Sequence, residues 1–175
     1  ALLEETPWVL QATDESARKR AIGLLFDLNR MADEQSRALD KLSKAQTPNG
    51  GFTWFPGMPE DRYMTQHIIT GFAHLDVLGV KSVRDDSRTW TLVTQALHYM
   101  DQHIVRDYEM LKALAKKKEV NLDDKHIGYL EIQYLYARSY FNDEKPSGIL
   151  KEAVDYYLKQ AAQYWTSENI YMQGM

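Results

Sequence analysis

Five histidines are the residues of this 175-residue chain whose chemistry first suggests a metal or acid–base site. His67 and His74 lie seven residues apart, and His98 and His103 lie five apart. Zinc needs three or four convergent ligands, and the helical zinc motif sets its two histidines four residues apart. Neither spacing meets that requirement. We therefore expect ordinary partly buried or surface histidines, no metal site and no cofactor.

Acidic residues occur as adjacent pairs at Glu4-Glu5, Asp85-Asp86 and Asp123-Asp124. Glycoside hydrolysis uses two carboxylates that face each other across the substrate. Adjacent residues on a helix do not face one another, and each of these pairs stands where a helix is expected to begin. Helix capping explains them, so the sequence predicts no catalytic residue.

The chain contains no cysteine, which excludes a disulfide, a thiolate nucleophile and a thioester within these residues. It also contains no G-x-S-x-G, P-loop or G-x-G-x-x-G motif. The 21 basic and 25 acidic residues give a formal charge of −4, which argues against a nucleic-acid partner. The run Lys116-Lys117-Lys118 is short and is typical of a solvated helix end.

Aromatic residues are numerous, with four tryptophans and eleven tyrosines. Such side chains can line a sugar-binding groove. At helical spacing they more often pack in the core and between helices. We therefore interpret them first as packing residues.

The segment from Gln46 to Pro59 is the most distinctive part of the chain. It holds three of the five prolines and three glycines, so it predicts a structured loop that ends one helix and starts the next. Glycine permits the reversal, and aromatic side chains fix the angle to the following helix. Its characteristic residues are Gln46, Gly50, Gly51, Phe52, Trp54 and Gly57.

Helical periodicity dominates on both sides of this loop, and no segment shows a convincing strand alternation. The expected helices are 15–46 with a possible break at 31–34, a second from Asp61 to Gly79, a third from Asp86 or Ser87 to the lysine run, a fourth over 127–141 started by Asp123 or Asp124, a fifth from Pro146 to Trp165, and the opening of a sixth at 170–175. The sequence therefore predicts an all-α fold of helical hairpins.

The loop resembles the repeat turn of α/α toroids, the barrel shared by terpene cyclases, protein prenyltransferases and complement thioester domains. Several blocks in order resemble the bacterial alpha-2-macroglobulin family, in the large form found in Bacteroidetes. These blocks are Glu5–Leu10, Leu24–Met31, Pro48–Gly57, Tyr63–Leu75, Tyr134–Ser139 and Tyr171–Met175.

The resemblance implies that residues 1–175 are part of an α/α-toroid domain of the thioester type, excised from a larger chain. It implies a periplasmic or cell-surface parent that traps proteases and that a membrane anchor can hold. The implied partners are proteases, through that parent, and the other domains of the same chain. The family writes its thioester site as Cys-x-Glu-Gln, and no cysteine here matches it, so no thioester residue is assigned.

Two other functions remain open at this stage. The first is an α/α-barrel enzyme acting on polysaccharide or isoprenoid substrates, for which the usual acidic and zinc-ligand motifs are absent. The second is a plain helical protein-interaction module. A partial toroid would expose inner-helix surface that its missing half should bury, so we expect an adhesive apolar face and a possible dimer through it.

Overall fold

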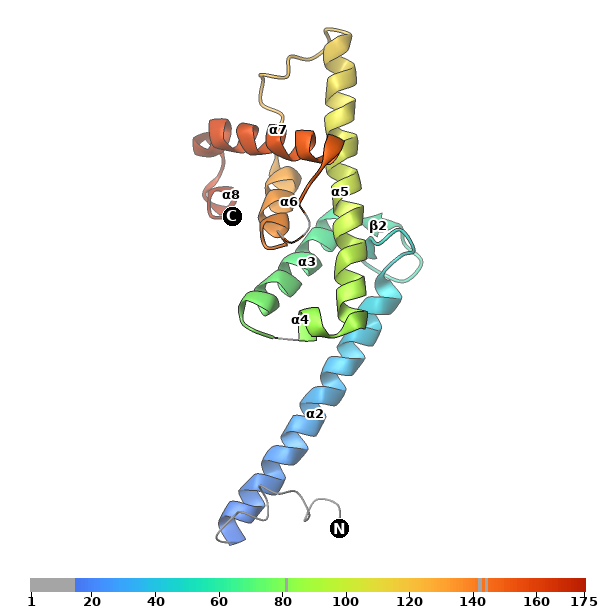
Figure 1. Cartoon of the computed structure of the whole chain (residues 1–175), viewed down its shortest axis with the longest axis vertical. Helices are drawn as coiled ribbons and strands as arrows, with labels where there is room; N and C mark the ends of the chain where they lie inside the picture. The colour runs from blue at the N-terminus through green and yellow to red at the C-terminus, as the bar shows by residue number, and fades with distance from the viewer. Residues whose placement is uncertain (1–14, 81, 142, 144) are drawn as a thin grey trace. The chain divides into compact units, whose positions relative to one another are not determined.

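The computed structural model of the chain describes residues 15–80, 82–141, 143 and 145–175. It confirms an all-α fold (Figure 1). The elements are α2 (Glu15–Ala45), β1 (Phe52–Thr53), β2 (Glu60–Asp61), α3 (Arg62–Val77), α4 (Ser82–Asp85), α5 (Ser87–Lys116), α6 (Tyr129–Ser139), α7 (Gly148–Tyr164), the 3₁₀ turn η1 (Trp165–Ser167) and α8 (Ile170–Gln173). The family block Glu5–Leu10 and the pair Glu4-Glu5 lie outside the described residues. None of the described helices is both long and apolar enough to cross a membrane.

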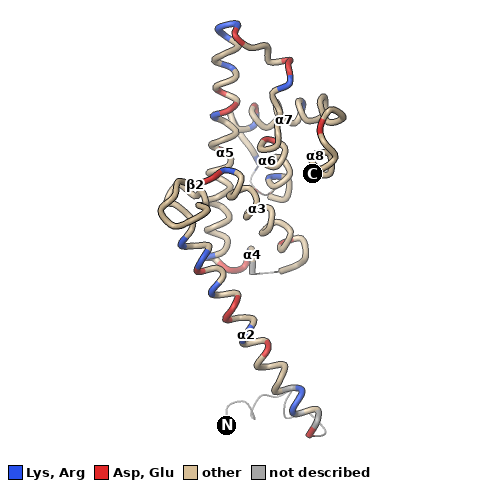
Figure 2. Tube along the Cα trace, turned by 180° about the vertical axis from the view of Figure 1, so that it is seen from behind, with Lys and Arg blue, Asp and Glu red and all other residues tan. Residues whose placement is uncertain are grey.

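The chain divides into two compact units, and the first of them, up to Lys44, is described by α2. This helix is continuous over its 31 residues, so the break considered at 31–34 does not occur. Lysine and arginine alternate with acidic residues along it (Figure 2). Leu24, Leu28 and Met31 lie at helical spacing and are all exposed. Within its own unit, α2 therefore presents an uncovered apolar stripe.

The second unit, Ala45–Met175, contains the hydrophobic core. Helices α3, α6 and α7 lie on one side of α5, and α7 runs across it (Figure 1). Among the described helices, the long α5 supplies the largest number of buried apolar residues, because its apolar residues recur every three or four positions. Its fully buried residues include Val93, Ala96, Met100 and Ile104. Ile69 and Ala73 of α3 and Tyr134 of α6 are also fully buried, and both of these helices contact α5.

Side-chain caps fix where α3 and α5 begin. The Asp61 carboxylate accepts a hydrogen bond from the Met64 amide at 2.7 Å, and Asp86 accepts one from the Thr89 amide at 2.8 Å. Each carboxylate satisfies a backbone donor that the first turn of a helix leaves free. The expected start at Asp61 is confirmed, and of the two candidates for the third helix Asp86 is the cap.

The expected start of the fourth helix is wrong. Asp123 and Asp124 cap nothing, and α6 begins at Tyr129. There the Gly128 amide donates to the Glu131 carboxylate at 2.9 Å, so a residue inside the helix reaches back to satisfy its first donor. The segment before it is held instead by α7, because Gln160 bonds the backbone at Leu122, Asp124 and His126. A tertiary contact therefore outweighs local capping.

Three further elements differ from the expectation. The four-residue α4 precedes α5 and was not predicted, and neither were the strands β1 and β2, each of two residues. They pair antiparallel, with Phe52 opposite Asp61 and Thr53 opposite Glu60. Strands this short carry too few residues for a period of two to show. Pro146 lies two residues before α7 rather than in its first turn.

Candidate functional site

The side chain of Gln46 joins the loop to α5. Its amide nitrogen donates to the Gly50 carbonyl at 3.0 Å and to the Leu92 carbonyl, in the interior of α5, at 2.9 Å. A carbonyl oxygen has two lone pairs, so Leu92 can accept this bond and still serve its own helix. The backbone closes the same turn, because the Thr47 amide donates to the Gly51 carbonyl at 2.8 Å. Gln46 therefore ties the first turn of the loop to a helix 46 residues further along the chain.

Gly50 and Gly51 let the backbone approach its neighbours closely. Gly50 has a φ of +93°, and a Cβ on it would lie 2.7 Å from the carbonyl carbon of Gln95. A Cβ on Gly51 would lie 2.6 Å from Cβ of Glu60 and 2.8 Å from the Tyr99 ring. No side chain fits at either position, so both glycines are required by packing.

Phe52 is the buried aromatic residue of the loop. Its side chain is fully inaccessible, and its amide donates to the Thr65 hydroxyl of α3 at 2.8 Å. Across the loop, the Asn49 side chain donates to Glu60 at 2.5 Å, and this hydrogen bond lowers the pKa of the Glu60 carboxyl. Phe52 thus fixes the entry into α3 from inside the core, while Asn49 fixes it from the surface.

The tip of the loop is exposed, in contrast to its base. Trp54 is 49% exposed and its ring stacks on Tyr63 of α3 with centroids 6.2 Å apart. Phe55 is 66% exposed, and Gly57 turns the chain with a φ of +84° in open space. Of the six characteristic loop residues, the four from Gln46 to Phe52 are therefore brought together at the base, and Trp54 and Gly57 lie apart from them.

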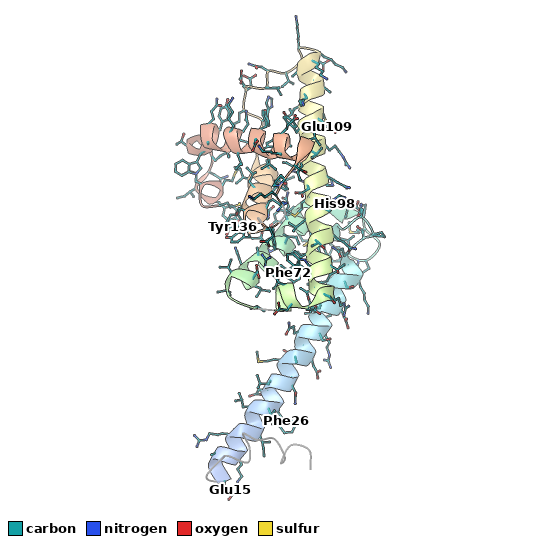
Figure 3. All side chains as sticks on the ribbon, in the orientation of Figure 1. Glu15, Phe26, Phe72, His98, Glu109 and Tyr136 are labelled. Carbon is teal, nitrogen blue, oxygen red and sulfur yellow. The ribbon has the colours of Figure 1, made fainter. Side chains whose placement is uncertain are left out.

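A second site, which the sequence analysis did not assign, is a groove of about 440 Å³ between α3, α6 and α8. We call it the α3–α6–α8 groove. Its size falls in the range of small-molecule sites. Tyr136, labelled in Figure 3, lines it from α6. The principal lining residues are His67, Thr70 and His74 of α3, Tyr129, Gln133 and Tyr136 of α6, and Tyr171 of α8.

Helical spacing explains how these residues meet. The α3 residues lie at positions i, i+3 and i+7, and the α6 residues lie at i, i+4 and i+7, so each set shares one helix face. That spacing was visible for His67 and His74. What the sequence could not give was the pairing of α3 with α6, which depends on the fold.

Histidine, tyrosine, threonine and glutamine side chains supply the polar groups of the groove. The His74 ring nitrogen and the Tyr136 hydroxyl are 2.9 Å apart, and the Tyr136 and Tyr140 hydroxyls are 2.8 Å apart. The hydrogen bond between the two tyrosines raises the pKa of Tyr136. Gln133 is only 4% exposed, and its side-chain oxygen has no hydrogen-bond partner in the described structure. No residue lining the groove is Asp, Glu, Lys or Arg.

A largely buried carboxylate joins α5 to α6. Asp101 accepts hydrogen bonds from the Tyr134 hydroxyl at 2.6 Å and from Nε of Arg138 at 3.3 Å. Burial raises the pKa of Asp101, and the two hydrogen bonds oppose that shift. Arg138 also donates to the Phe141 carbonyl. Because Tyr134 and Arg138 both lie on α6 and Asp101 lies on α5, we interpret this cluster as a structural link between the two helices.

The histidines do not converge on a metal centre. Among the described residues, no group of three or more His, Asp or Glu side chains is placed to hold a metal ion. His67 and His74 share the groove. His98 contacts Gln102 on the outside of α5, and His103 packs against Tyr99 with ring centroids 4.4 Å apart.

Comparison with known proteins adds no relative. No protein-family model matches the chain, and no curated protein and no solved structure is significantly similar to it. The site therefore has to be interpreted from its own geometry.

Replacing Gly50 with Ala tests the close approach of the loop to α5. We expect Gly50→Ala to lower the free energy of unfolding by at least about 2 kcal/mol, because a positive φ and a backbone clash combine. Gly57→Ala is the matched control, since it has a positive φ but open space, and should cost about 1 kcal/mol. Urea unfolding measures both. Equal losses for the two variants would contradict the packing requirement at Gly50.

Replacing Tyr134 with Phe tests the Asp101 cluster. We expect Tyr134→Phe to cost about 1.5–3 kcal/mol near neutral pH, because it removes a hydrogen bond to a carboxylate. It should also raise the pKa of Asp101 further. A raised native pKa means that the native state holds its proton longer than the unfolded state, so stability falls as pH rises through the window between the ordinary aspartate pKa and the raised one.

Urea unfolding at about pH 4 and pH 7 measures this dependence. The loss from Tyr134→Phe should be smaller at the acidic pH, where a larger share of Asp101 carries a proton because burial raises its pKa. Tyr164→Phe serves as the control, because the Tyr164 hydroxyl donates to the Asp123 carbonyl at an exposed position. A loss from Tyr134→Phe that is the same at both pH values would show that the Asp101 charge is not involved.

Proposed function

We propose that this chain is a non-catalytic helical segment of a bacterial alpha-2-macroglobulin-like protein that traps proteases. In this proposal it forms part of an α/α-toroid domain of the thioester type. The parent protein is periplasmic or on the cell surface, and a membrane anchor elsewhere in the parent can hold it there. Proteases and the other domains of the parent are its partners.

The observation that carries the proposal is that the loop residues serve packing between helices. The Pro48–Gly57 block contributes to the family resemblance, and its residues at the base serve packing. Gly50, Gly51 and Phe52 pack in the contact between α3 and α5, and none of them has a polar side-chain group. The side-chain amide of Gln46, just before them, donates to two backbone carbonyls. Because the residues of this motif pack and hydrogen-bond between helices, they support a scaffold role rather than a catalytic one.

The alternative of an α/α-barrel enzyme for polysaccharide or isoprenoid substrates has less support. General acid–base cleavage of a glycoside needs two carboxylates, and ionisation of a prenyl diphosphate needs acidic metal ligands. The described lining of the α3–α6–α8 groove includes no Asp or Glu side chain. The scaffold role is therefore preferred.

Protease challenge of the longest natural polypeptide that contains these residues tests the proposed function. After incubation with trypsin, we expect bait cleavage and trypsin that co-elutes with the inhibitor in size-exclusion chromatography. The retained trypsin should cleave a small peptide substrate but not casein, because enclosure blocks only large substrates. Trypsin with a covalently blocked active site is the control and should not be retained. Neither bait cleavage nor retained trypsin would contradict the proposal.

The exposed apolar stripe of α2 leads to a separate prediction about self-association. The same prediction bears on the alternative that the chain is a helical protein-interaction module. We propose that other helices cover Leu24, Leu28 and Met31 in the parent, and that a second copy can cover them in the isolated chain as a dimer. Sedimentation equilibrium should then show concentration-dependent association. The pair Leu24→Gln and Leu28→Gln keeps helix propensity and should weaken it at least about tenfold. A monomer at every concentration would contradict this expectation.

A further inference from the structure

The scaffold role does not explain the α3–α6–α8 groove. One residue in its lining has a buried polar atom that forms no hydrogen bond with any described residue. Gln133 is buried on α6, and no described residue forms a hydrogen bond with its side-chain oxygen. A buried polar atom without a hydrogen bond costs about 1–3 kcal/mol, and native proteins keep few of them. Gln133 is one of the residues that line the groove, so a ligand that draws its side-chain amide toward the opening can satisfy this oxygen.

The remaining lining favours neutral molecules with both polar and apolar faces. Its described residues include no Asp, Glu, Lys or Arg, so no ionised side chain of these types compensates a charged ligand. Tyr129, Tyr136 and Tyr171 offer ring faces and hydroxyls together. From the α3 side, Thr70 adds a hydroxyl and His74 adds an imidazole ring.

An aromatic row extends the groove along the surface. From Tyr171 the row runs to Tyr129, then to Tyr63 and Trp54, with successive ring centroids 6.1, 5.8 and 6.2 Å apart. Burial and a hydrogen bond with Tyr171 raise the pKa of Tyr129 to about 12, so its hydroxyl stays neutral at physiological pH. A continuous row of this kind fits an elongated ligand with repeating units better than a single compact molecule.

We propose that the α3–α6–α8 groove and this aromatic row bind a neutral oligosaccharide. Sugar rings present C–H faces that stack on tyrosine and tryptophan, and their hydroxyls both donate and accept hydrogen bonds. A sugar hydroxyl therefore pairs with Gln133 in either orientation of its amide. The site binds the sugar and catalyses no reaction on it. This inference does not rest on the proposed protease-trapping function.

A proline-rich peptide is the closest competitor, because aromatic grooves also bind polyproline helices. Proline lacks a backbone N–H, so such a peptide brings mainly acceptors. It would leave the Gln133 oxygen unpaired. The unmet acceptor thus favours the sugar over the peptide.

Titration of the chain, followed by ¹H–¹³C NMR of the aromatic rings, tests the proposal. The probes are the neutral hexasaccharides cellohexaose, mannohexaose and N-acetylchitohexaose, each up to about 10 mM, where even a millimolar Kd approaches saturation. Comparison probes are a heparin hexasaccharide and a proline-rich decapeptide. We expect at least one neutral hexasaccharide to give saturable shifts of the Tyr129, Tyr136 and Tyr171 rings.

Two variants with matched controls make the test specific. Gln133→Leu removes the unpaired acceptor while keeping a side chain of similar size, so the chain should stay folded and binding should weaken at least about tenfold. Gln163→Leu, at an exposed position on α7, should leave binding unchanged. Tyr171→Ala should weaken binding about tenfold, whereas Phe55→Ala, outside the row, should not.

Three results would overturn the proposal. The first is the absence of saturable shifts with every neutral hexasaccharide. The second is binding that Gln133→Leu and Tyr171→Ala leave unchanged, which would place the sugar elsewhere. The third is tighter binding of the heparin hexasaccharide or of the proline-rich peptide, which would assign the groove to a different class of ligand.

Discussion

The amide of Gln46 makes the contact on which the second unit depends. One side chain donates to a carbonyl of its own turn and to a carbonyl in the second turn of α5, 2.9 Å away. Both bonds are partly shielded from water, where an unmade hydrogen bond is costly. The glycines beside it bring the loop backbone against α5, and Phe52 then enters the core and bonds Thr65 of α3. The position of α3 relative to α5 follows from these contacts.

That position in turn creates the α3–α6–α8 groove. With its start fixed by Asp61 and the loop, α3 buries Ile69 and Ala73 against the core and presents its histidines to α6. Tyr129 and Tyr136 complete the groove from the other side. The loop and the groove are therefore two consequences of one arrangement, the first serving the scaffold and the second available to a ligand.

The all-α fold, the starts of α3 and α5 and the importance of Gln46, Gly50 and Gly51 could be predicted from local sequence, because caps, prolines and glycines act over a few residues. The start of α6 could not, since Gln160 holds the preceding segment from 34 or more residues away. The groove was missed for the same reason. The seven-residue spacing of His67 and His74 places them on one helix face, but Tyr129 and Gln133 meet them only through tertiary packing.

Native-state hydrogen exchange of a Gln46→Met variant is the most direct test of this account. Methionine keeps the length and volume of the side chain but removes both donated hydrogen bonds. The account predicts that the Phe52 amide and the amides of α3 lose protection together, because the loop positions α3 through that contact. If only residues 46–51 lost protection while α3 kept its own, the loop would be an attachment to a unit that holds together without it, and the central claim would be wrong.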